Sequence, residues 1–143
     1  LVKIDEGVST KAAYAAFDEL TSVQHAESTD AIESAAELPL FNNLAAASEQ
    51  VLPELAEARE WLASQAGVAH DEAGNAEVLL CGSGSATFAI VEDGDSIRKA
   101  ADIVAAAKLK GMWARSCSFA PIGVRVLDGS GVGSNLGAPR KIW

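Results

Sequence analysis

Two apolar runs joined by four small residues limit the possible folds of this chain more than any other feature. The stretch LLCGSGSATFAIV, residues 79–91, places two glycines and two serines between segments rich in apolar and β-branched side chains. This pattern is typical of two antiparallel strands connected by a short turn. The sequence therefore predicts a β-hairpin with strands at residues 76–81 and 86–91. A lone hairpin is barely stable in water, so other elements must cover its apolar face.

Helical patterns lie on both sides of the hairpin. Apolar residues recur at helical spacing in residues 11–23, 44–51, 53–62 and 97–110. Candidate helix caps are Ser9, Thr10, Asn42, Asn43, Asp93 and Asp95. Further strand-like runs occur at residues 1–4, 112–119 and 124–127. The order predicts an α+β fold, a two-layer ferredoxin-like sandwich with an antiparallel sheet and helices on one face.

Length and charge indicate one domain with a small ligand. We expect residues 1–128 of the 143 to fold and the glycine-rich residues 129–143 to form a flexible tail. A net charge of −9 argues against nucleic-acid binding, because such proteins neutralise phosphates with clustered Lys and Arg. No apolar run approaches the roughly 20 residues that span a bilayer, so no membrane partner is expected.

The cysteines and histidines predict neither a disulfide nor a metal site. Cys81 and Cys117 each lie in an apolar stretch, which favours buried, reduced thiols and a cytoplasmic protein. His25 and His70 lie in polar stretches without a second ligand at metal spacing. We expect both histidines on the surface.

The four small residues of the hairpin have two interpretations. They lack the lysine of a P-loop and the three-glycine spacing of a dinucleotide-binding loop, so they are a simple turn or an anion-binding loop. In the second case, main-chain amides would bind phosphate oxygens, and the glycines would permit close approach. The candidate phosphate-binding residues are Gly82, Ser83, Gly84 and Ser85.

The same stretch resembles the third signature motif of the GHMP kinases, a superfamily of small-molecule kinases. Three flanking segments, GVSTKAAYAAFDEL, FNNLAAASEQVLPEL and residues 97–119, resemble the C-terminal domain of one branch. That branch phosphorylates 4-diphosphocytidyl-2-C-methyl-D-erythritol in non-mevalonate isoprenoid biosynthesis. Its usual Asn-Asp pair is replaced here by Asn42 and Asn43. The resemblance extends over most of residues 2–127.

The resemblance implies the C-terminal domain of an ATP-dependent kinase with a preceding catalytic domain that nothing here matches. ATP, Mg²⁺ and the catalytic residues belong to the full-length enzyme, so this chain alone is expected to be inactive. Thr10 would lie near bound substrate, Tyr14 would pack on the cytosine ring, and residues 82–85 would hold the diphosphate.

Several alternatives stay open at this point. Thr10 can be a helix cap, and Tyr14 with Phe17 can belong to a core stripe. The substrate can be that of another GHMP kinase, such as homoserine, mevalonate or a sugar. The chain can also be a non-catalytic ferredoxin-like module that binds a ligand and whose glycines only form a turn.

Overall fold

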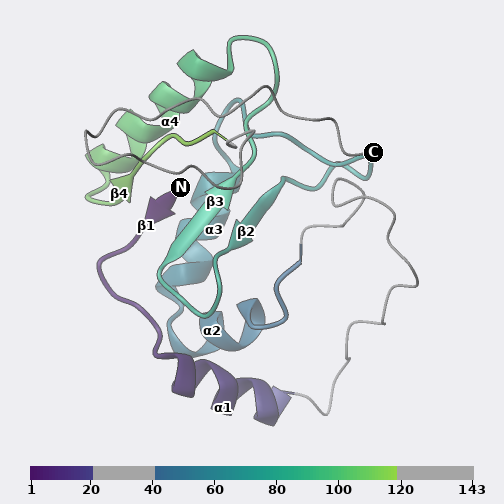
Figure 1. Cartoon of the computed structure of the whole chain (residues 1–143), viewed down its shortest axis with the longest axis vertical. Coiled ribbons are helices and arrows are strands. Elements are labelled where there is room, and N and C mark those ends of the chain that lie inside the picture. Colours follow the sequence, from purple (N-terminus) through teal and green to yellow (C-terminus); the bar gives the residue numbers. More distant parts are fainter. Residues whose placement is uncertain (21–40, 119–143) are drawn as a thin grey trace, which may run out of the picture.

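A computed structural model describes residues 1–20 and 41–118 of the chain (Figure 1). In chain order these form β1 (Val2–Lys3), α1 (Thr10–Leu20), α2 (Ala45–Val51), α3 (Glu54–Ala63), β2 (Val78–Leu80), β3 (Ala86–Ala89), α4 (Ser96–Leu109) and β4 (Trp113–Ala114). The predicted strand at 124–127, the predicted tail and His25 lie outside the described residues.

The strands form one antiparallel sheet in the order β2-β3-β1-β4. With helices between β1 and β2 and between β3 and β4, the connectivity is the βαββαβ pattern of ferredoxin-like folds. The N-terminal strand therefore lies inside the sheet, between the hairpin and β4. The predicted α+β ferredoxin-like sandwich is confirmed.

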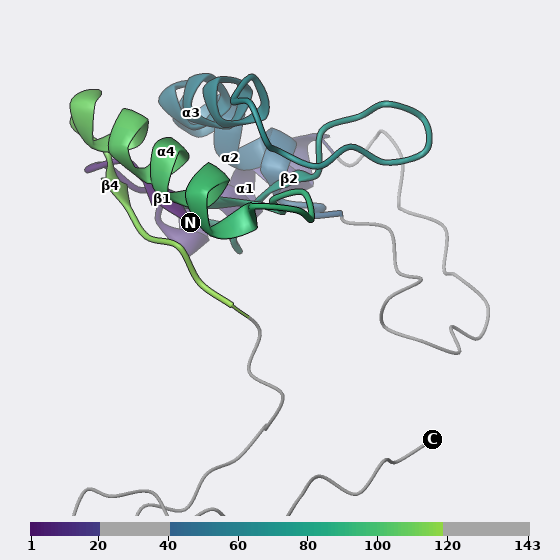
Figure 2. The ribbon, with the colours of Figure 1, turned by 90° about the horizontal axis from the view of Figure 1, so that it is seen from above.

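The core lies between the sheet and the helices α3 and α4, which lie on the same side of it (Figure 2). Because side chains alternate along a strand, one row faces this side across all four strands. That row is buried and consists of Leu80, Thr87, Val2 and Ala114. Leu62 of α3 and Ile103 and Ala107 of α4 pack in one cluster with Val2 and Ala114. No helix in the described part is long and apolar enough to cross a bilayer.

The helices α1 and α2 begin close to their predicted positions, but only α1 is capped by a predicted residue. Ser9 caps α1, since its Oγ accepts a hydrogen bond from the Ala12 amide at 3.1 Å. Asn42 or Asn43 was expected to cap α2, but the residue before the helix is Leu44, and no side chain caps it. Asn42 lies two residues before Leu44. Its Oδ1 instead accepts from the Leu44 amide at 2.9 Å, just before the helix begins. The side chain is thus left with its amide group free to reach another element.

The predictions near α4 and β4 need three corrections. Asp95 precedes α4 with a left-handed φ of 56°, and its carboxylate pairs with Arg98 instead of capping the helix. Of the strand expected over residues 112–119, the described part, up to residue 118, contains only Trp113–Ala114. Cys117 is exposed rather than buried, although both it and Cys81 are free thiols as predicted. These details depend on side-chain pairing and on where the sheet ends, which local patterns do not specify.

Candidate functional site

The glycine loop, residues 82–85, is the turn that joins β2 to β3 and points toward α1 and α2 (Figure 1). The Gly84 amide donates to the Cys81 carbonyl at 3.3 Å and closes the turn. Gly82 has a φ of +59°, a conformation that favours glycine. An added Cβ at Gly84 would lie 3.2 Å from the Cys81 oxygen, so this position is also tight. The turn interpretation is therefore correct for the backbone.

The same loop leaves main-chain amides unused. The N–H groups of Gly82, Ser83 and Ser85 have no hydrogen-bond acceptor among the described residues. Gly82 is exposed, and a Cβ built on it would meet nothing within 4 Å. Open N–H groups beside free space are suited to bind an anion. The turn and the anion-binding interpretations are thus compatible.

Thr10 reaches the loop from the start of α1. Its Oγ1 lies 3.1 Å from the Ser83 Oγ, a hydrogen bond between residues 73 positions apart in the chain. Ser9 makes the capping bond of this helix, so the capping interpretation of Thr10 is not needed. Two segments that the sequence marked separately therefore meet at one point.

Tyr14 lies one helical turn after Thr10 and faces solvent. Its side chain is 54% exposed, whereas Ala13 is the buried residue of α1. Residues four apart on a helix share a face, so Tyr14 follows Thr10 on the same side. The core-stripe interpretation of Tyr14 is wrong, and its ring is available to a ligand.

Asn42 and Ser48 also belong to this site, and neither was predicted there. The Asn42 Nδ2 donates to the carbonyls of Leu80 and Gly82 at 2.8 and 2.7 Å. Ser48, which is fully buried, donates through Oγ to the Ser83 carbonyl at 3.2 Å. The available signal was a polar residue, Ser48, on the apolar side of a short helix. Such a residue needs a buried partner.

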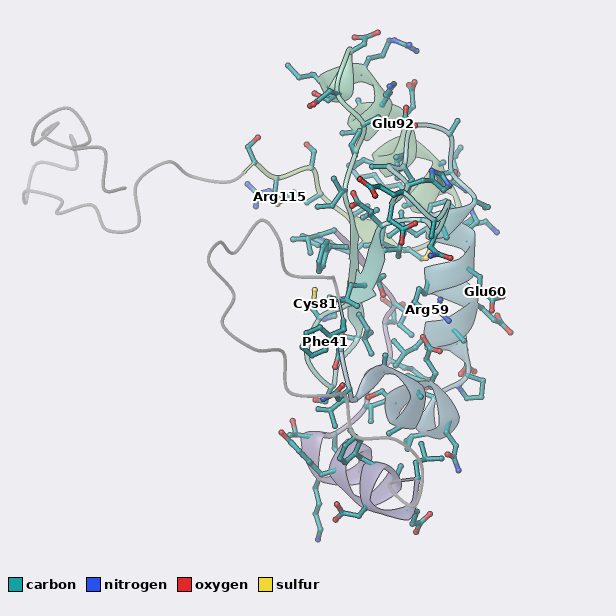
Figure 3. All side chains as sticks on the ribbon, turned by 90° about the vertical axis from the view of Figure 1, so that its right-hand side faces the viewer. Phe41, Arg59, Glu60, Cys81, Glu92 and Arg115 are labelled. Atoms are coloured by element: carbon teal, nitrogen blue, oxygen red, sulfur yellow. The ribbon has the colours of Figure 1, made fainter. Side chains whose placement is uncertain are left out.

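The chemistry of these residues suits binding rather than catalysis. Cys81 flanks the loop, but burial raises the pKa of its thiol, which keeps the thiol protonated and a poor nucleophile at neutral pH. Figure 3 shows Cys81 with Phe41 on the face of the sheet away from Arg59 and Glu60 of α3. In the described ranges, no group of three His, Cys, Asp or Glu side chains is placed to hold a metal ion.

Comparison with known proteins gives the family. The family model described as "GHMP kinases C terminal" matches residues 13–110, which include Tyr14 and the glycine loop. The chain belongs to this family. A 4-diphosphocytidyl-2-C-methyl-D-erythritol kinase from Desulfitobacterium hafniense (strain Y51) is 36% identical over 110 residues. No solved structure is similar enough to count as a match.

The match to this relative is partial. It covers 72% of the present chain but only 36% of the relative's own length. The GHMP domain described above thus corresponds to about a third of the relative. Family membership supports a kinase.

Proposed function

We propose that this chain is the substrate-binding C-terminal part of an ATP-dependent kinase that phosphorylates 4-diphosphocytidyl-2-C-methyl-D-erythritol. Family membership and a relative bearing the name of that kinase support this proposal. The observation that carries it is the Thr10–Ser83 hydrogen bond beside three unused loop amides. It joins the helix that would contact the cytidine to the loop that would contact the diphosphate.

Each part of the site would bind one part of the substrate. The amides of Gly82, Ser83 and Ser85 would donate to diphosphate oxygens, with the Ser83 and Thr10 hydroxyls alongside. Charge-assisted hydrogen bonds of this kind are stronger than neutral ones. The exposed ring of Tyr14 would stack on the cytosine, since flat aromatic surfaces pair well with a base.

The chain would contribute orientation and no reacting group. Phosphoryl transfer depends mainly on positioning and charge stabilisation, so a domain that fixes the acceptor substrate lowers the barrier without touching the transferred phosphate. ATP and Mg²⁺ would be bound by the preceding catalytic domain that the resemblance implies. We place the protein in the cytoplasm, where free thiols such as Cys81 and Cys117 persist.

The test is a titration of the full-length protein with the cytidine substrate and, separately, with homoserine, mevalonate and galactose. We expect binding and ATP-dependent phosphorylation with the cytidine compound alone. Preference for one of the other three would assign the protein to another GHMP activity. Binding without phosphorylation of any of them would favour a non-catalytic module.

The present chain by itself is expected to bind the substrate without transferring phosphate. Incubation with radiolabelled ATP and the cytidine compound should give no labelled product above a protein-free control. Turnover by the 143-residue chain would contradict this division of roles.

A further inference from the structure

The glycine loop is asymmetric in how its main-chain groups are used. Four carbonyls in and beside the loop accept a hydrogen bond from another element or segment, namely those of Leu80, Gly82, Ser83 and Ser85. The Cys81 carbonyl accepts from the Gly84 amide within the turn itself. The N–H groups of Gly82, Ser83 and Ser85, by contrast, find no acceptor in the described part of the chain. The domain thus holds the acceptor side of the loop and leaves the donor side open.

Asn42 makes the central contacts of this arrangement. Both hydrogens of its amide group are used, on the Leu80 and Gly82 carbonyls, and its Oδ1 accepts from the Leu44 amide. The side-chain orientation follows from these partners, because the opposite orientation would place an oxygen against two carbonyl oxygens. One side chain therefore joins the end of β2, the first residue of the loop and the entrance to α2.

Ser48 supports the next peptide group. Its hydroxyl is fully buried and donates to the Ser83 carbonyl at 3.2 Å. α2, which carries this serine, is itself tied to α3 by the ion pair between Glu49 and Arg59. The loop is thus anchored to the helical layer rather than only to its own strands.

Peptide geometry connects these contacts to the free amides. In a trans peptide, the C=O of one residue and the N–H of the next point in opposite directions. Holding the Gly82 carbonyl against Asn42 therefore turns the Ser83 N–H away from Asn42. The bond from the Gly84 amide to the Cys81 carbonyl turns the Gly82 N–H outward in the same way.

We propose that Asn42 is a positioning residue, supported by Ser48, which orients the loop so that the free N–H groups of Gly82 and Ser83 face a diphosphate before one arrives. This inference rests on the proposed function for the identity of the ligand. The orientation itself is a property of the ligand-free domain. Preorganised donors bind an anion more tightly because no ordering is needed at the moment of binding.

Asn42→Asp tests this role with the smallest change of shape. Aspartate keeps an oxygen for the Leu44 amide but cannot donate to two carbonyls, and its charge faces their oxygens. Asn43→Asp is the matched control, because it makes the same change one residue later on an exposed side chain without a hydrogen bond to the described residues. Ser48→Ala is a milder second variant that removes one bond.

Hydrogen–deuterium exchange of the full-length protein, without ligand, measures how firmly the loop is held in this conformation. In Asn42→Asp we expect the hydrogen-bonded amides of Cys81 and Gly84 to exchange about tenfold faster, as loss of one to two hydrogen bonds predicts. In Ser48→Ala the same two amides should exchange about threefold faster than in the wild type. In Asn43→Asp they should exchange at the wild-type rate. Equal exchange in Asn42→Asp and Asn43→Asp would overturn the proposal, whatever the ligand.

Ligand affinity separates this inference from the proposed function. With cytidine diphosphate as the probe, Asn42→Asp should raise Kd about tenfold over Asn43→Asp, and in the kinase assay it should raise KM for the cytidine substrate more than KM for ATP. If exchange rises but wild-type protein does not bind cytidine diphosphate, Asn42 orients the loop and the proposed function is wrong. If exchange rises while cytidine diphosphate binds all variants equally, the loop is not where the diphosphate binds.

Discussion

Tyr14 presents just over half of its side chain to solvent, one turn of α1 beyond the Thr10–Ser83 hydrogen bond. The ring therefore contributes little to the core, which is compatible with the proposed contact with substrate. An exposed aromatic near a loop with free main-chain N–H groups suits the proposed substrate, which carries both a base and a diphosphate.

Tyr14→Ala should weaken binding of the cytidine substrate about tenfold, because base–aromatic stacking contributes roughly 1–3 kcal/mol. The KM for ATP and the free energy of unfolding should change little, since the side chain is exposed. Isothermal titration of the full-length protein measures the effect. Trp113→Ala removes an aromatic of similar exposure, 51%, at β4 and serves as the control. An unaltered substrate Kd in Tyr14→Ala would contradict the stacking role.

Among the elements, the short α2 has a larger role than its length suggests. It carries Ser48 beneath the glycine loop and is fixed to α3 by two hydrogen bonds from Arg59 to the Glu49 carboxylate. Hydrogen bonding to the Glu49 carboxylate raises the pKa of the Arg59 guanidinium. A half-buried bidentate pair restricts how the two helices can move, and through Ser48 it restricts the loop.

The turn of residues 71–75 shows how one carboxylate stabilises a connection before β2. The Asp71 carboxylate accepts from the Asn75 backbone amide at 2.7 Å and from its side-chain amide at 3.0 Å. These bonds, the side-chain one foremost, lower the pKa of Asp71 below its ordinary value of 3.8. A depressed pKa in the folded state gives stability that is complete above the ordinary value and is lost as pH falls through the folded value.

In Asp71→Asn the free energy of unfolding should therefore fall less steeply than in the wild type between about pH 5 and pH 2. The reason is that the variant has no carboxylate beside Asn75 that can be protonated. Urea unfolding at a series of pH values measures it. Glu72→Gln neutralises the neighbouring exposed carboxylate, which makes no hydrogen bond with the described residues, and should retain the wild-type slope. If the free energy of unfolding changes with pH equally in Asp71→Asn and the wild type, Asp71 does not contribute to the loss of stability in acid.

For the whole molecule, stability depends on the layer between the sheet and the helices α3 and α4. Leu62 is 2% exposed in this core, whereas Leu109 at the end of α4 is 90% exposed. The two leucines therefore offer the same side chain in opposite environments.

Leu62→Ala should lower the free energy of unfolding by about 2–5 kcal/mol, because it removes buried methyl groups and leaves a cavity. Leu109→Ala should change it by less than about 0.5 kcal/mol. Urea denaturation of the chain compares them. Similar losses in both variants would mean that this layer is not the core of the domain in solution.

Local sequence patterns predicted most of the fold, and the functional roles given to the site residues stay predictions. The hairpin, the long helices and their order could be read from the chain, because hydrophobic spacing and turn-forming glycines act over a few residues. The motif around Gly82 and Gly84 also indicated the family, which the match to residues 13–110 shows. The exact limits of β4 and the pairing of Asp95 with Arg98 could not be read, since they depend on neighbours in space.

The sequence by itself determined which elements form and that a small glycine-rich turn joins two strands. Only the tertiary structure decided that Thr10 meets Ser83, that Tyr14 is exposed, and that Asn42 holds the loop from 40 residues away. The physical reason is that these contacts join segments far apart in the chain. Their geometry is set by how the helices pack on the sheet, and a local pattern contains no information about that packing.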